Sequence, residues 1–169
     1  LYREQGADIV ALQEVENQAS LDAILRYLRS FDDYPFDVAL IGETGFDASL
    51  DVALLARGDL VRTVTHREDR IDRPGGGTTT FSREFLEVHL DVPPRDDPGG
   101  ATQRVIAFVT HFKSQNNDDP SRRRAEAIAA RRIVVDVARR NPDALVVLAG
   151  DLNAAPGEPA IEDLEEGGD

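Results

Sequence analysis

Two short runs of apolar residues, each uninterrupted by polar positions, constrain the fold of this chain most. They lie at residues 8–12 and 145–149. A strand without polar alternation is typically covered on both faces, as in layered α/β proteins. We therefore expect both runs to be buried strands of a layered α/β domain.

Five β-rich stretches lie between these runs, separated by clusters of Gly, Pro and Asp. They cover residues 36–41, 50–56, 60–65, 82–92 and 104–112. Two Gly- and Pro-rich segments, at 70–80 and 93–102, are expected to be mobile loops. This order predicts a mixed-sheet sandwich rather than a helical bundle.

Apolar residues at helical spacing predict three helices. The first carries Leu21, Ile24, Leu25 and Leu28, with Ser20 as the expected N-cap. The second should run from residue 121 to about 140 and end at Asn141-Pro142, and a short third helix is expected at 159–164. These helices should flank the sheets.

Composition excludes several classes of protein and site. The chain has no Cys, which excludes disulfide scaffolds and thiolate zinc sites, so that a metal can be bound only through oxygen or His. No apolar run approaches the roughly 18 residues of a membrane span. The net charge of −13 opposes indiscriminate binding of polyanions, so any phosphate site must be local.

Three of the apolar strands end in polar residues that could carry chemistry. Glu14 and Glu16 follow the first run, and Glu14 is a natural ligand for a hard cation, unless both are ordinary solvated acids. Asp151 and Asn153 follow the last run and can converge on a water or a phosphate, although an Asx turn explains them equally well. His111 ends a third strand and can supply a proton or hydrogen bond, or be structural.

A local basic patch lies within the expected helix at 121–140. It holds seven Arg against Glu126 and Asp136, inside an otherwise acidic chain. We interpret most of these Arg as the solvated face of an amphipathic helix. The pattern leaves one or two of Arg122, Arg123 and Arg124 able to reach a phosphate.

The motifs Leu-Gln-Glu, Thr-His-Phe-Lys-Ser and Gly-Asp-Leu-Asn-Ala-Ala-Pro occur in this order, each at the end of an apolar strand. In this respect the whole chain resembles the endonuclease/exonuclease/phosphatase superfamily. The stretches ADIVALQEVEN and THFKS are most similar to its extracellular bacterial nucleases. The resemblance implies an α/β (α+β) fold, namely a four-layered α/β sandwich of two mixed sheets flanked by helices.

The resemblance also implies a function and roles for individual residues. It implies a metal-dependent phosphodiester hydrolase using Mg²⁺, or Mn²⁺ or Ca²⁺, most similar to nucleases that act on DNA or RNA. Glu14 corresponds to the metal-binding glutamate, and Asp151 to the aspartate that orients or deprotonates the attacking water. Asn153 corresponds to a phosphate-contacting residue, and His111 to the histidine that hydrogen-bonds the scissile phosphate.

A fourth fragment, Thr80-Phe81-Ser82-Arg83-Glu84, is similar to a deoxyribonuclease pattern. This similarity implies that Arg83 lies near the substrate and that Glu84 braces His111, as a further catalytic residue. Lys113 is grouped with the substrate-binding residues. The alternative is an exposed Arg-Glu pair at the start of a strand.

Two features of the superfamily are missing from this sequence. A strand ending in Asn usually precedes the glutamate, and a Ser-Asp-His stretch usually follows far beyond the Gly-Asp-x-Asn motif. The chain also lacks Met and begins with Leu1. We therefore expect residues 1–169 to be one incomplete domain, truncated at both ends, with weak or no activity alone.

Other interpretations of partner and location remain open. A nucleic acid is the first expected substrate, with a lipid headgroup or an inositol phosphate as alternatives on the same fold. A non-catalytic interaction module that retains the fold is a third possibility. The resemblance favours an extracellular or periplasmic location without stable membrane insertion, and the oligomeric state is left open.

Overall fold

Two β-sheets stack face to face in the computed structural model, which describes residues 6–31, 36–43 and 51–165. The first sheet has the order β1 (Ile9–Val15), β3 (Asp51–Ala56), β2 (Val38–Gly42), and its neighbours are antiparallel. The second has the order β4 (Asp59–Thr65), β7 (Leu86–Val92), β8 (Gln103–His111), β9 (Leu145–Asp151). Only its β8–β9 pair is parallel. A small hairpin of β5 (Ile71–Asp72) and β6 (Thr78–Thr79) lies in the segment expected to be a loop.

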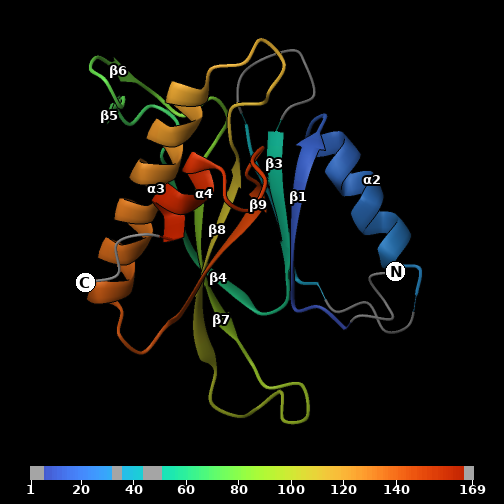
Figure 1. Ribbon diagram of the computed structural model, residues 1–169. Helices are drawn as coiled ribbons and strands as arrows, with labels where there is room; N and C mark the ends of the chain where they lie inside the picture. Colours follow the sequence, from blue (N-terminus) through green and yellow to red (C-terminus); the bar gives the residue numbers. More distant parts are fainter. Residues whose placement is uncertain (1–5, 32–35, 44–50, 166–169) are drawn as a thin grey trace.

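Helices cover the outer faces of both sheets and complete four layers (Figure 1). Helix α2 (Gln18–Leu28) packs on the first sheet through Leu21, which is fully buried. Helices α3 (Pro120–Arg140) and α4 (Pro159–Glu165) cover the second sheet. The four-layered α/β sandwich is therefore confirmed. Within the described ranges, no helix is both long and apolar enough to cross a bilayer.

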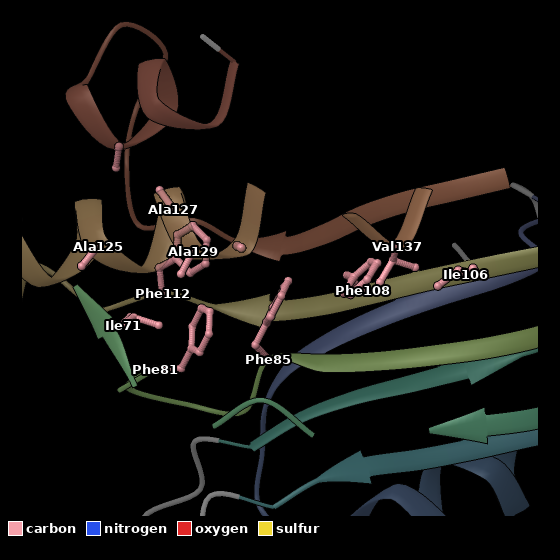
Figure 2. Packing of buried hydrophobic residues seen from close by; sticks show 12 residues of the cluster. Ile71, Phe81, Phe85, Ile106, Phe108, Phe112, Ala125, Ala127, Ala129 and Val137 are labelled. Atoms are coloured by element: carbon pink, nitrogen blue, oxygen red, sulfur yellow. The ribbon is translucent and has the colours of Figure 1, made fainter. Parts of the chain in front are cut away.

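Alternation along β8 shows how the sequence builds two cores at once. Val105, Ala107 and Val109 face the first sheet and join the core between the sheets. Ile106 and Phe108 point the opposite way, because successive side chains of a strand alternate, and they pack beneath α3 (Figure 2). Burying a side chain such as Phe108 stabilises the fold by about 1.5–3 kcal/mol.

Three local expectations are wrong. The apolar strands β1 and β9 are not buried on both faces: each is the last strand of its sheet, and Leu145 of β9 is 54% exposed. Residues 82–85 are not part of β7, because the Ser82 N–H donates to the Glu126 carboxylate instead of a neighbouring strand. Asn17, not Ser20, caps α2, and its side chain accepts from the Ser20 N–H. Residue 50, expected in β3, lies outside the described residues.

Candidate active site

The carboxyl ends of β8 and β9 bring His111 and Asp151 together. The two strands are parallel and in register, with His111 paired directly to Asp151. The imidazole Nε2 lies 3.8 Å from the Asp151 carboxylate oxygen Oδ2. The carboxyl ends of β1, β8 and β9 lie at the same end of the sandwich (Figure 1). Residues that follow these three strands therefore lie at one end of the molecule.

The backbones of β8 and β9 approach each other closely at the residues just before His111 and Asp151. Gly150 has a φ of +147°, and a Cβ atom at this position would overlap the carbonyl of Thr110 on β8. Only glycine tolerates both conditions, because it has no side chain. The Gly of the Gly-Asp-Leu-Asn motif thus allows β9 to approach β8 where the polar residues begin.

The carbonyl oxygen of Phe112 connects Asn153 and Arg83 to the end of β8. It accepts a 3.0 Å hydrogen bond from Asn153 Nδ2 and a 3.5 Å contact from Arg83 Nη1. The Asn153 N–H also donates to the Asp151 carboxylate at 2.8 Å, so the Asx turn is present. This turn holds Asn153 at a φ of +49°, a strained conformation of the kind that clusters at functional sites.

Glu14 lies in a β-bulge of β1. Leu12 pairs with Ala53 and Val15 with Asp51, so three steps on β1 match two on β3. Leu12 and Val15 consequently both face α2, whereas a regular strand would place them on opposite faces. Glu14 has a φ of +59° within this bulge, and its side chain is exposed. Bulges of this kind re-aim a side chain, and they are common beside active sites.

Burial and the neighbouring charges set the protonation state of His111. The residue is 3% exposed, and burial together with the positive charge of Arg83 lowers its pKa. The negative charges of Asp151 and Glu14 act in the opposite direction but do not compensate. His111 is therefore neutral at pH 7. Its Nδ1 atom is buried and has no hydrogen-bond partner within the described residues.

Comparison with known protein families shows which family the chain belongs to. The sequence profile of the Endonuclease/Exonuclease/phosphatase family matches residues 1–169. The chain belongs to this family. Members of the family are phosphodiesterase and nuclease hydrolases, and they generally use divalent metals. No curated protein sequence matches this chain significantly.

Solved structures of the family have the same fold. TDP2 from Caenorhabditis elegans is 21% identical, with a TM-score of 0.62 over 91% of this chain and 40% of that one. The 2',3'-cyclic phosphatase ANGEL2 is 18% identical, with a TM-score of 0.64 over 98% of this chain and 45% of that one. Sphingomyelinase C from Streptomyces griseocarneus is 22% identical, with a TM-score of 0.59 over 95% of this chain and 56% of that one. The chain thus spans about half the length of these structures.

The expected bond between Glu84 and His111 is wrong. Glu84 is buried, and its Oε1 atom accepts hydrogen bonds from the backbone N–H groups of His66 and Arg67, at 2.8 and 3.2 Å. The carboxylate therefore anchors the segment that follows β4. Burial raises the pKa of Glu84, although these backbone donors oppose the shift. Arg83, its neighbour, does reach the candidate site through the Phe112 carbonyl.

The remaining basic candidates have partners within the protein. The Lys113 ammonium donates to the carbonyls of Ser114 and Asn116, both at 2.7 Å. Arg122 bonds the Thr80 carbonyl, Arg123 bonds the Lys113 carbonyl and Asp118, and Arg124 bonds Asp163. Arg122 and Arg123 thus tie loops to α3, and Arg123 is buried, whereas Arg124 ties α4 to α3.

Glu126 is a positioning residue that the sequence analysis missed. It is fully buried on α3 and accepts from the N–H groups of Ser82 and Lys113, at 2.8 and 2.6 Å. It thereby joins the segment carrying Arg83 to the segment that follows His111. Burial raises its pKa despite these donors. Its position among the buried Ala residues of α3 was the available signal, which the surrounding Arg residues obscured.

The donor set at this end of the sandwich fits an open metal site, not a closed one. Within the described part of the chain, no three His, Cys, Asp or Glu residues are grouped so as to hold an ion. Glu14 and Asp151 are exposed, and the charge of each acts on His111. Mg²⁺ typically binds one or two carboxylates and keeps waters or substrate phosphates as its other ligands. These two carboxylates are compatible with that mode.

Proposed function

We propose that this chain carries the active site of a metal-dependent phosphodiester hydrolase, a nuclease that cleaves DNA or RNA. The observation that supports this most is the common location of His111, Asp151 and Asn153, where the charge of Glu14 also acts on the histidine. The carboxylate can accept a proton from water, and the imidazole and the amide can donate hydrogen bonds to phosphate oxygens. Hydrolysis of a phosphate ester requires both functions.

Each residue has a chemical task in this proposal. Glu14 would hold a divalent ion such as Mg²⁺, and the bound ion would supply positive charge to offset the negative charge that develops in the reaction. The Asp151 carboxylate accepts a proton from the attacking water or orients it. Neutral His111 can donate one hydrogen bond to a phosphate oxygen, and this bond gains strength as negative charge develops.

Arg83 and Asn153 are the substrate-binding residues of the proposal. Both contact the Phe112 carbonyl, which holds them beside His111. The guanidinium of Arg83 is suited to a phosphate because it is planar and always charged. Its Nε atom is buried without a partner within the described residues, so a bound phosphate would satisfy a donor that the protein leaves unpaired.

The metal-binding role of Glu14 is tested by comparing two carboxylates of the same segment. In the protein at its natural length, Glu14→Ala should weaken Mn²⁺ binding in calorimetry and reduce Mg²⁺-dependent nicking of plasmid DNA by about 100-fold. The matched control is Glu16→Ala, because Glu16 is also exposed and its carboxylate accepts a hydrogen bond from the Ser20 hydroxyl. Equal metal binding and nicking in both variants would contradict the proposal.

The two competing interpretations predict other outcomes of the same assay. A lipid-headgroup phosphodiesterase, as the similarity to sphingomyelinase C would allow, should hydrolyse sphingomyelin vesicles and leave plasmid DNA and RNA intact. A non-catalytic module should cleave none of these substrates even with Mg²⁺. Either result would replace the nuclease proposal.

A further inference from the structure

A polar pocket lies far from the candidate active site, on the outer face of the second sheet. It has a volume of about 290 Å³ and is lined by Arg62, His89, Arg104, Val137, Arg140 and Asn141. Its residues come from β4, β7, the start of β8 and the carboxyl end of α3, at the opposite end of α3 from the candidate site (Figure 1). Along β8, His111 is seven steps from Arg104, or roughly 23 Å.

Each of the three arginines that line the pocket is paired with a carboxylate that lies outside the lining. Arg104 binds Asp91 through Nε and Nη2, at 2.7 and 3.2 Å. Arg140 uses the same two atoms for the carbonyl and carboxylate of Asp136. These ion pairs leave the Nη1 amino group of each guanidinium outside the pairs. The Arg104–Asp91 pair is half-buried and orients its guanidinium, whereas the Arg140–Asp136 pair is exposed.

The third arginine shares its carboxylate with two histidines. Arg62 Nη2 lies 3.0 Å from Glu87 Oε1, and the same carboxylate contacts His89 at 2.5 Å and His66 at 3.1 Å. One buried carboxylate thus binds a guanidinium and two imidazoles. The Arg62 side chain is 59% exposed, although its carboxylate partner is buried.

The lining of the pocket contains hydrogen-bond donors but no carboxylate. Each guanidinium is paired with a carboxylate outside the lining, so the cluster is balanced in charge, but only the guanidinium side of each pair lines the pocket. Guanidiniums bind phosphate oxygens through paired N–H groups. The pocket volume is at the lower limit of small-molecule sites, which limits the ligand to one phosphate and a small substituent.

We propose that this pocket binds inorganic phosphate or the phosphate group of a small phosphate ester. Arg62, Arg104 and Arg140 bind the oxygens, and Asn141 at the end of α3 supplies the rim. The site is separate from the proposed hydrolase site and does not depend on it. Free phosphate and a phosphate ester share the binding chemistry, so the experiment compares the two.

The test uses phosphate and glycerol 3-phosphate as probes at constant ionic strength. Calorimetry should show saturable binding of phosphate, and the thermal midpoint should rise with phosphate but not with chloride, because a ligand of the native state stabilises it. Tighter binding of glycerol 3-phosphate would identify an ester as the better ligand, and tighter binding of phosphate would identify the free ion.

Arg140→Gln should weaken phosphate binding about tenfold or more, because one charged donor is lost. The matched control is Arg132→Gln, an exposed arginine of the same helix outside the pocket, which should bind as the wild type does. Arg62→Gln provides a second variant from a different element. His111→Ala, which alters the candidate active site, should leave this binding intact.

Three results would overturn the proposal. The first is an absence of saturable phosphate binding in the wild-type protein. The second is equal affinity in the wild type, Arg140→Gln and Arg62→Gln. The third is a loss of binding in His111→Ala alone, which would assign the phosphate to the hydrolase site.

Discussion

The candidate active site and the group around Glu87 use the same residue types in opposite ways. At the candidate site, buried His111 leaves Nδ1 unpartnered within the described residues, next to the exposed carboxylate of Asp151. In the Glu87 cluster, which comprises Glu87, His66, His89, Arg62 and Asp69, the carboxylate is buried and bonded to three side chains. An unsatisfied group beside an exposed acid is typical of a site, whereas the buried carboxylate of a satisfied network supports the fold, even where its partners Arg62 and His89 line the proposed phosphate pocket.

The largest expected effect comes from breaking the satisfied network. Glu87→Gln should lower the free energy of unfolding by about 3–5 kcal/mol, because it leaves Arg62 and two histidines without their shared buried charge. Urea denaturation measures this. Glu14→Gln is the control from the candidate site, and because Glu14 is exposed it should change stability by less than about 0.5 kcal/mol. Similar losses in both variants would remove the contrast.

A smaller effect should come from the backbone of the candidate site. Gly150→Ala should destabilise the protein by roughly 2–4 kcal/mol, because the new Cβ overlaps the Thr110 carbonyl and the φ of +147° is strained. Gly157→Ala is matched to it, since its φ is also positive but no atom lies within 4 Å of the new Cβ. It should cost about 1 kcal/mol in the same denaturation experiment. Equal costs would show that β9 can move away from β8.

The smallest effect is a difference in pH dependence between two histidines. Burial lowers the pKa of His66, but hydrogen bonds to Glu87 and Asp69 outweigh it and the net pKa is raised. His66 therefore contributes stability below its unfolded pKa of about 6.5, and this contribution is lost as the pH rises through the higher folded value. The pKa of His111 is lowered, so its neutral form is favoured and stability falls as the pH drops below about 6.5.

Unfolding curves of two variants between pH 5 and pH 8 measure this difference. Relative to the wild type, His66→Gln should lose most stability at the acid end, and the loss should shrink as the pH rises. His111→Gln should compare best with the wild type at the acid end, because it removes a group that resists protonation. If the stability of both variants relative to the wild type changed with pH in the same direction, the two histidine environments would not differ as described.

Much of the architecture was predictable because it depends on local periodicity. The β-rich composition of residues 104–112 and the apolar stripe of α3 predicted both elements to within about one residue. The motif order predicted the four-layered fold and the family, both of which are confirmed. The burial of β1 and β9 was not predictable, because an apolar run does not reveal which strand lies at the edge of a sheet.

The sequence by itself determined the order of elements and the residue types available at strand ends, since both are carried by neighbours along the chain. Only the tertiary structure decided which groups meet. Three features depend on contacts between distant segments. They are the β-bulge at Glu14, the hydrogen bonds of Glu84 to the segment after β4 and the hydrogen bonds that Glu126 accepts. A carboxylate accepts a hydrogen bond from any donor that lies within reach in the folded protein. Which donor this is depends on how the layers pack against one another.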